Sequence, residues 1–300
     1  MRPEDRTTTS ARARFAPYAW LVLGSVCISF SPVFVKLAHV GPTSAAFWRM
    51  AIGGLALALA AALRGGFTFG GAATLGLALA CAVAFGIDLV AWHTAIHLIG
   101  PGMATILANI QVVLLAAWGV VVLGERGLPR LVASLLLAAA GIWLLFGPDW
   151  TARPEASLWG LTLGIVAAIS YAAFLIFLRR LQTRQNFSEQ LRNMAFLGLL
   201  TAALLAGAAL LGGESLAIRN LSDLAALSGY GLLGQALGWT LIAANLPRVP
   251  LSSAGLVILL QPTLAFGWDV LLFGRRAGLP DLVGASLALG AIFLGATRRK

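Results

Sequence analysis

The sequence predicts an all-α integral membrane protein in which ten transmembrane helices form two inverted five-helix repeats. Hydrophobic residues make up 59% of the 300 positions and charged residues only 11%, and the mean hydropathy is +0.89. Soluble domains carry about 25% charged residues. Apolar runs of roughly 20 residues, the length that crosses a bilayer core, recur along the whole chain, and the second half resembles the first. The alternating apolar and polar residues of a membrane β-barrel are not seen.

Short connections containing Gly and Pro separate the apolar runs, for example "GPG" at 100–102 and "LPRVP" at 246–250. No soluble domain fits between them. The ten expected helices cover residues 17–38, 44–63, 72–95, 101–123, 129–147, 158–179, 190–211, 225–246, 251–273 and 280–297.

The distribution of Lys and Arg predicts the orientation, because cytoplasmic loops carry an excess of these residues. With the N-terminus in the cytoplasm, fourteen basic residues lie on that side: Arg2, Arg6, Arg12, Arg14, Arg64, Arg126, Arg130, Arg179, Arg180, Arg184, Arg248, Arg298, Arg299 and Lys300. Four lie in the opposite loops: Arg153, Arg219, Arg275 and Arg276. We therefore expect a multi-pass protein of the cell (inner) membrane with both termini cytoplasmic, and Arg275-Arg276 as the main misfit.

The remaining global features fit this orientation. The net charge of +10 is assigned to helix ends, so no nucleic-acid partner is expected. Cys27 and Cys81 lie inside apolar segments, which argues against a disulfide scaffold or a thiolate metal site. The first apolar run is too long for a signal-peptide core and is expected to be retained. The expected parts are a cytoplasmic N-terminal tail (1–16), a first repeat (17–148), an external linker (149–157), a second repeat (158–297) and a cytoplasmic basic tail (298–300).

Two segments about half a chain apart match each other and indicate the duplication. Gln111, Trp118 and Gly124 align with Gln261, Trp268 and Gly274, and Trp92 similarly aligns with Trp239. Because each unit has five helices, an odd number, the second unit begins on the other side of the membrane. Inverted repeats of this kind are typical of secondary transporters, in which the substrate binds near the midplane between the halves. We expect each half to supply one wall of a shared cavity.

The matched segments also resemble a known family. They read "ATILANIQVVLLAAWGVVVLGE" (Ala104–Glu125) and "AGLVILLQPTLAFGWDVLLFGR" (Ala254–Arg275), and Trp20 and Phe34 flank the first helix. With these features the chain resembles a ten-helix member of the drug/metabolite transporter superfamily, of the EamA type, over nearly its whole length. The resemblance implies a carrier that exports small organic metabolites.

The chain departs from the family pattern in two places. Helix four has Val112 where the family usually has a proline, whereas the second copy keeps Pro262. A proline removes a backbone hydrogen bond and can create a hinge, so we expect the two halves to flex unequally. The first copy ends in Gly124-Glu125, but the second reads Gly274-Arg275.

Four charged residues inside or beside helices are candidates for ion coupling or gating. Asp88 and Asp269 are the acids well inside helices, where a charge usually faces a cavity or a partner. Each is either a proton-coupling or cation-binding carboxylate or a structural ion-pair partner of Lys36 or Arg49. Lys36 and Arg49 either snorkel to the headgroups, or face inward and bind a substrate carboxylate or close an outer gate.

Neutral polar and aromatic residues at similar depths are candidates for substrate binding. Their alternative role is helix packing through hydrogen bonds or apolar contacts. The candidates are Asn109, Gln111, Gln235, Gln261, Trp92, Tyr171, Trp239 and Trp268. Because Asp88 aligns with Gln235, the site is expected to have one ionisable wall and one neutral wall.

The sequence indicates neither a metal nor a cofactor. His93 and His97 have the i, i+4 spacing of metal ligands on a helix, but no third ligand completes the pattern, and we interpret them as an interfacial pair. There is no "GxxxxGK[ST]" nucleotide loop. Energy would therefore come from an ion gradient, with the proton as a candidate ion, from exchange, or from the substrate's own gradient.

The leading hypothesis is a secondary transporter of small organic metabolites, amino acids or related compounds, working by alternating access through a central cavity. One alternative is efflux of cationic drugs, which would require Asp88. An intramembrane enzyme lacks a convergent catalytic set, so the protein is not expected to be an enzyme, and a non-transporting receptor is the remaining alternative. The partners expected are the small-molecule substrate and the lipid bilayer, with the oligomeric state, monomer or homodimer, left open.

Overall fold

The computed structural model describes residues 3–64, 71–151 and 158–296, and every regular element in this part of the chain is helical. The predicted all-α fold class is confirmed. Most of the expected linker (149–157) and the basic tail (298–300) lie outside the described residues, as do Arg2 and Arg153. The segment expected as an N-terminal tail is helical from Pro3 onward and continuous with the first span.

Ten helical paths account for the predicted spans. The first repeat contains α1 (Pro3–Ser29) with α2 (Ser31–Leu37), α3 (Pro42–Ala62), α4 (Ala72–Ile99), α5 (Pro101–Ala108) with α6 (Gln111–Val121), and α7 (Leu128–Thr151). The second contains α8 (Leu158–Gln182), α9 (Phe187–Leu211), α10 (Leu221–Gly229) with the π-helix η1 (Tyr230–Trp239) and α11 (Thr240–Asn245), the 3₁₀ turn η2 (Leu246–Arg248), α12 (Leu251–Ile258) with α13 (Leu260–Phe273), and α14 (Leu279–Ala296). Eight paths are long and apolar enough to cross a membrane. Helix α14 is a shorter apolar helix, and the path from α10 to α11 is divided by its π-helix.

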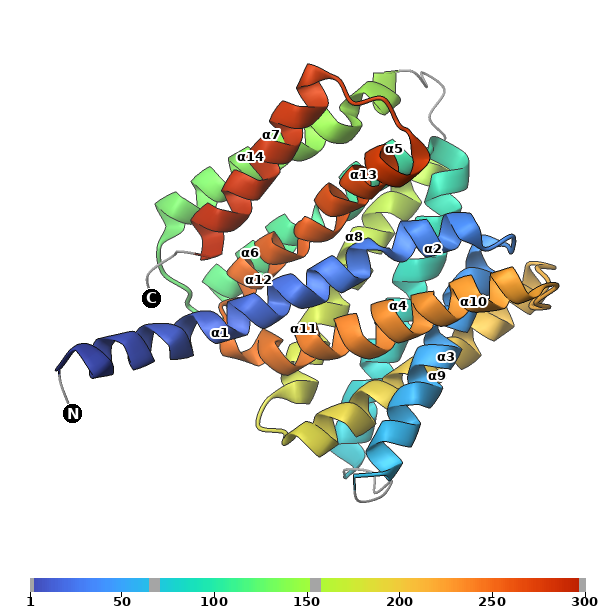
Figure 1. Cartoon of the computed structure of the whole chain (residues 1–300), viewed down its shortest axis with the longest axis horizontal. Coiled ribbons are helices and arrows are strands. Elements are labelled where there is room, and N and C mark those ends of the chain that lie inside the picture. The colour runs from blue at the N-terminus through green and yellow to red at the C-terminus, as the bar shows by residue number, and fades with distance from the viewer. Residues whose placement is uncertain (1–2, 65–70, 152–157, 297–300) are drawn as a thin grey trace.

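The two repeats interlock across the molecule. Helix α3 packs against α9 and α7 against α14, each pair joining equivalent helices of the two repeats. The first helix of each repeat packs into the other repeat: α1 lies against η1, α11 and α13, and α8 lies against α4, α5 and α6. The start of α1 and the end of α14 lie on the same side (Figure 1). We call this side the termini end and the other the opposite end.

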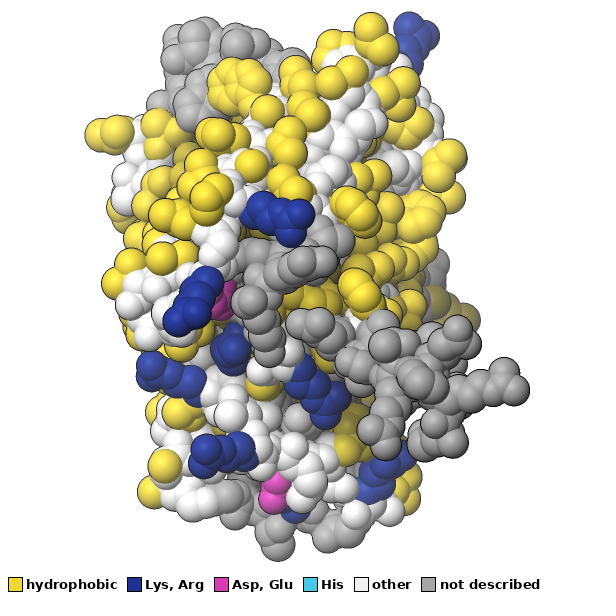
Figure 2. Space-filling view, turned by 90° about the vertical axis from the view of Figure 1, so that its left-hand side faces the viewer, with side chains coloured by type: hydrophobic (Ala, Val, Ile, Leu, Met, Phe, Trp, Pro, Cys, Tyr) yellow, Lys and Arg dark blue, Asp and Glu magenta, His cyan; other side chains and the backbone are white. Residues whose placement is uncertain are grey.

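Basic side chains are concentrated at the termini end. Figure 2 views the molecule from this side, and Lys and Arg side chains gather in the middle and lower part of the face. This distribution fits the predicted cytoplasmic location of both termini, which stays a prediction.

Small residues bring the helices of the α7–α14 pair into close contact. A Cβ atom added to Gly141 would lie 2.7 Å from the backbone nitrogen of Ala288, and one added to Gly284 would lie 2.9 Å from the carbonyl oxygen of Gly141. Such close backbone approach is the usual role of small residues at membrane helix interfaces.

Helices four and nine are interrupted at equivalent positions. The break falls at Asn109–Ile110 between α5 and α6, and at Leu259 between α12 and α13. The first break contains no proline. There the backbone forms a tighter turn, in which Val112 N–H donates to the Asn109 carbonyl, three residues earlier, at 3.1 Å. Interruption of helix four therefore does not depend on proline, whereas unequal flexing of the halves stays a prediction.

Candidate functional site

Arg49 is buried inside the bundle. It lies seven residues into α3, is 5% exposed, and its Nη1 donates a hydrogen bond to the Tyr230 hydroxyl at 3.2 Å. The guanidinium carbon lies 5.0 Å from the centre of the Tyr230 ring and 5.7 Å from that of Phe85, within the range of cation–π attraction. The snorkelling interpretation is therefore wrong for Arg49, because α3 turns this position towards η1 and α4.

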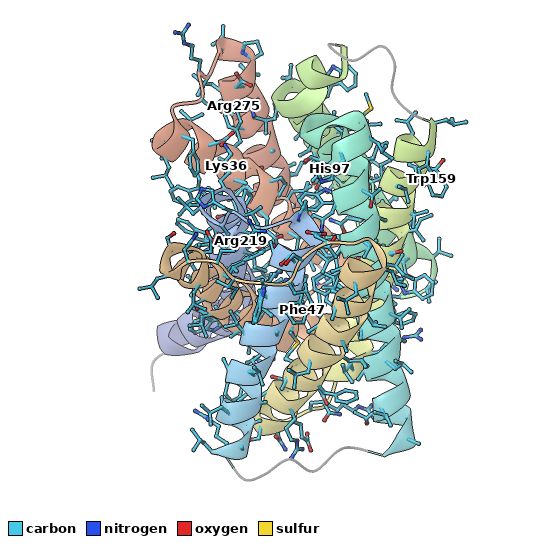
Figure 3. All side chains as sticks on the ribbon, turned by 90° about the vertical axis from the view of Figure 1, so that its right-hand side faces the viewer. Lys36, Phe47, His97, Trp159, Arg219 and Arg275 are labelled. Atoms are coloured by element: carbon cyan, nitrogen blue, oxygen red, sulfur yellow. The ribbon has the colours of Figure 1, made fainter. Side chains whose placement is uncertain are left out.

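Asp88 and His93 lie on α4 beside Arg49. Both are buried, and Asp88 lies one helical turn from Phe85, whose ring centre is 5.7 Å from the Arg49 guanidinium carbon. In the described part of the chain, Asp88 forms no direct ion pair with Arg49, and the Nδ1 atom of His93 has no hydrogen-bond partner. The interfacial interpretation is wrong for His93, which faces the bundle interior, whereas His97 is exposed (Figure 3).

Four aromatic side chains pack together next to these polar groups. The rings of Phe85 and Phe174 stack with centres 4.3 Å apart, and the Trp239 ring meets both edge-on at 5.4 and 5.0 Å. Tyr171 joins the group 6.1 Å from Trp239. We call Phe85, Tyr171, Phe174 and Trp239 the aromatic wall. Tyr171 and Trp239 were predicted, but the two phenylalanines were missed, although each lies one helical turn from a predicted site residue.

The second repeat contributes neutral polar side chains. Gln235, which aligns with Asp88, is fully buried in η1, and neither atom of its amide has a hydrogen-bond partner in the described structure. Thr240, which aligns with His93, is buried and similarly unpartnered. The matched positions therefore carry ionisable groups in the first repeat and neutral groups in the second. A π-helix such as η1 often occurs at a functional site.

The two glutamines of the duplicated segment flank the helix interruptions. Gln111 opens α6 and is 1% exposed, and its Oε1 atom has no partner among the described residues. The side chain of Gln261 lies beside Tyr171 of the aromatic wall, and its Nε2 atom has no hydrogen-bond partner in the described structure. Leaving a buried polar group unsatisfied costs about 1–3 kcal/mol, so these amides are suited to bind a polar solute.

Three other predicted binding residues have packing roles. Trp92 packs in an apolar cluster with Ile99 and Met103, away from the aromatic wall. Asn109 Nδ2 donates to the Thr105 carbonyl of its own helix at 2.7 Å. Trp268 Nε1 donates to Ser29 Oγ at 2.8 Å, and its ring stacks on Phe30, which joins α13 to α1.

An ionic cluster occupies the opposite end of the bundle. Lys36 of α2 forms an ion pair with Asp269 of α13, and Arg275 lies 3.8 Å from the other oxygen of Asp269. Figure 3 shows Lys36 and Arg275 on the same part of this face. The ammonium of Lys36 also lies 4.3 Å from the centre of the Phe273 ring. Asp269, rather than Asp88, therefore forms the structural ion pair that was one of the two predicted roles. Arg275, whose position did not fit the predicted charge distribution, lies next to Asp269.

At the termini end, a carboxylate of the first repeat caps a helix of the second. Glu125 Oε1 accepts a hydrogen bond from Leu251 N–H at 2.6 Å, and Oε2 accepts from Ser252 N–H at 3.4 Å and from the Ser252 hydroxyl. Every residue from Leu251 to Leu260 is buried, and α12 packs against α6. The equivalent pair at the opposite end, α5 and α13, makes at most marginal contact within the described residues. Within the described residues, α6 and α12 therefore pack closely at the termini end, whereas α5 and α13 do not pack closely at the opposite end.

No group of three or more His, Cys, Asp or Glu side chains arranged to hold a metal occurs among the described residues. The expected absence of a metal and of cofactors stays an expectation.

Comparison with known proteins gives one family and one fold. A sequence model of the EamA-like transporter family matches residues 16–147 and 158–297. A solved structure described as "Crystal structure of protein" is 18% identical, aligns over 93% of this chain and 97% of its own, and superposes with a TM-score of 0.78. At this identity the likeness shows the fold alone. No curated protein matches the chain significantly.

Proposed function

The chain belongs to the EamA-like transporter family, and on this premise we propose that it exports small organic metabolites, amino acids or related compounds. Transport proceeds by alternating access to a central site between the inverted repeats. The family assignment indicates a membrane transporter rather than an enzyme.

The observation that carries this proposal is the set of buried polar atoms without partners, contributed by both repeats. Arg49, His93 and Gln111 come from the first repeat, and Gln235 and Gln261 from the second. A metabolite with several hydrogen-bonding groups would satisfy these atoms when it binds. The aromatic wall beside them offers apolar surface to the rest of the solute.

The asymmetric closure suggests which step of the cycle this conformation represents. The contact of Glu125 with α12 holds the termini end shut, whereas α5 and α13 leave the opposite end less tightly packed. With the termini in the cytoplasm, this is the state that faces outward, after an exported solute has left. Return to the inward-facing state requires α12 to separate from Glu125.

Cationic-drug efflux is the competing function, and the aromatic wall near Asp88 favours it. The position of Arg49 argues against it, because a bound cation would lie beside a buried guanidinium that acts on the same carboxylate. A thermal-shift screen of the purified protein against amino acids, polyamines and quaternary ammonium compounds separates the two functions. Stabilisation by quaternary ammonium compounds alone would contradict the metabolite proposal.

Transport by reconstituted protein tests the site itself. In proteoliposomes loaded with labelled amino acids, Trp239→Phe is expected to reduce flux about tenfold, because the unpartnered indole N–H of Trp239 lies at the site. Trp92→Phe is the matched control and should leave flux within about twofold of wild type. Equal effects of the two substitutions would remove the aromatic wall from the substrate path.

A further inference from the structure

The guanidinium of Arg49 lacks a counter-ion in direct contact. In the described structure its one hydrogen bond goes to the neutral hydroxyl of Tyr230, and its Nε atom has no partner. An isolated buried charge is costly, and buried arginines are normally paired with carboxylates or phosphates. The planar guanidinium is also suited to binding a carboxylate through two parallel hydrogen bonds.

Among the described residues, no acid supplies that counter-ion. Asp269 is bound to Lys36 at the opposite end, and Glu125 caps α12 at the termini end. Asp88 lies one helical turn along α4 from Phe85, whose ring centre is 5.7 Å from the guanidinium carbon of Arg49, and it forms no direct ion pair with Arg49 within the described residues. Arg49 and Asp88 thus place a guanidinium and a carboxyl group near each other without contact, and an ammonium group of a ligand would favour the ionised form of that carboxyl.

The balance of charge restricts the ligand that fits between them. A simple anion would bind Arg49 but would also lie near the carboxylate of Asp88, and a simple cation would bind Asp88 near the guanidinium of Arg49. A zwitterion gives each buried charge an opposite partner and leaves the total charge of the site unchanged. An α-amino acid carries both groups on one carbon, so it can reach two neighbouring charges at once.

The surroundings of Arg49 also indicate the rest of the ligand. The Phe85 ring adjoins the guanidinium on one side and stacks on Phe174 on the other. A ligand held by Arg49 and Asp88 therefore has the aromatic wall beside it. This surface favours an apolar side chain.

We propose that Arg49 binds the carboxylate of the substrate, that Asp88 binds its ammonium group, and that the carrier therefore selects zwitterionic amino acids with apolar side chains. Tyr230 is the positioning residue that holds the guanidinium through its hydroxyl. The inference rests on the proposed function and narrows it to one substrate class and one mode of recognition.

Binding of a charge series to the purified full-length protein tests the proposal. The probes are leucine and phenylalanine, their amides, which lack the carboxylate, and their N-acetyl derivatives, which lack the ammonium group. In wild type both amino acids should bind at least about tenfold more tightly than either derivative, because each derivative loses one charge-assisted contact. If no amino acid of the series binds, or if the amides bind as tightly as the amino acids, the proposal is overturned.

Single substitutions test which residue binds the carboxylate of the substrate and which binds its ammonium group. Arg49→Gln should weaken amino-acid binding about tenfold to a hundredfold and leave the amides almost unchanged, whereas Asp88→Asn should spare the N-acetyl derivatives. Arg276→Gln and Asp281→Asn remove the same charges elsewhere and should leave the selectivity unchanged. A parallel loss for all ligands in Arg49→Gln would contradict the assignment.

Conservative variants keep the test decisive if Arg49→Gln does not fold. Tyr230→Phe and Arg49→Lys should both fold, and each should weaken the amino acids several-fold more than the amides. Equal weakening of both ligand classes would reduce Tyr230 and Arg49 to structural roles. Failure of the proposed function is a separate result, since it would appear as absence of solute flux in proteoliposomes of wild-type protein.

Discussion

At the scale of single residues, burial separates the candidate charges into two groups. Arg49, Asp88 and His93 are buried, whereas Lys36, Asp269 and Arg275 are partly exposed and form an ionic cluster. A partly exposed ion pair contributes little to stability, about 0–1 kcal/mol, while a buried carboxylate without a direct partner is a candidate for function. Asp88 is therefore the stronger candidate for ion coupling.

Replacement of Asp88 tests this at the same scale. Asp88→Asn removes the group that could take up a proton once the substrate ammonium has left, so the pH dependence of the residual transport in reconstituted vesicles is expected to flatten. Asp269→Asn serves as the comparison, because its carboxylate lies in the exposed ionic cluster. An unchanged pH profile for Asp88→Asn would exclude this residue from coupling.

At the scale of elements, the cap on α12 has no counterpart in the other repeat. Glu125 aligns with Arg275, which cannot accept a hydrogen bond from a helix N-terminus. Leu251 and Ser252 align with Pro101, which has no N–H, and Gly102, which has no hydroxyl. Asp269 stands where the first repeat has Gly119, and Arg275, which follows α13, lies near this acid instead of capping a helix. The symmetry-equivalent positions at the opposite end therefore provide neither the carboxylate acceptor nor the donors of this cap.

Removal of the cap is expected to loosen the termini end. A lost N-terminal cap costs about 1 kcal/mol, which corresponds to about a fivefold shift in a two-state equilibrium. In a background without Cys27 and Cys81, a cysteine at the buried position Ala254 should react several-fold faster with a thiol reagent when Glu125 is replaced by Ala.

The matched control is Glu189→Ala. Glu189 and Asn186 form a capping box at the same end of the bundle, but both belong to α9, so no contact between the repeats is lost. Labelling of position 254 should stay at the rate of the parent protein. Equal acceleration by both substitutions would mean that Glu125 only stabilises the fold.

The α7–α14 contact gives a second prediction at this scale. Gly141→Val places atoms within 3 Å of the α14 backbone, and overpacking of this kind costs about 1–3 kcal/mol. A lower midpoint of thermal unfolding in detergent is expected. Gly290→Val on α14 is the control, since nothing lies within 4 Å of a Cβ atom there, and a similar loss in both variants would argue against the glycine contact.

At the scale of the whole molecule, the single-sided cap implies a preferred resting state. In the proposed alternating-access cycle the inverted repeats adopt two related conformations, and the hydrogen bonds of Glu125 form in the one that is closed at the termini end. We therefore expect the conformation that is closed at the termini end to be the more populated one in the absence of substrate.

The orientation of the molecule is testable independently of transport. Ten spans place both termini on one side, and the excess of basic residues predicts that this side is the cytoplasm. Reporter fusions after Lys300, or reagents directed at an N-terminal tag, should report a cytoplasmic location in intact cells. Termini on opposite sides of the membrane would contradict the ten-span arrangement.

The sequence by itself determined the environment, the number of spans and the inverted duplication. Composition and the length of apolar runs depend only on the solvent that surrounds the helices, and the repeat is visible as aligned residues such as Gln111 and Gln261. The asymmetry between Asp88 and Gln235 could likewise be predicted from the alignment.

The tertiary structure decided which polar residues meet. Snorkelling at a helix end and burial against another helix are compatible with the same local sequence around Arg49. The choice depends on how α3, α4 and η1 pack, and that packing joins Arg49 to Tyr230, a residue 181 positions away. For the same reason Lys36 and Asp269, and Glu125 and Ser252, were recognised as partners only in the folded chain. Pairings between distant segments are set by the contacts of whole helices, which no local pattern records.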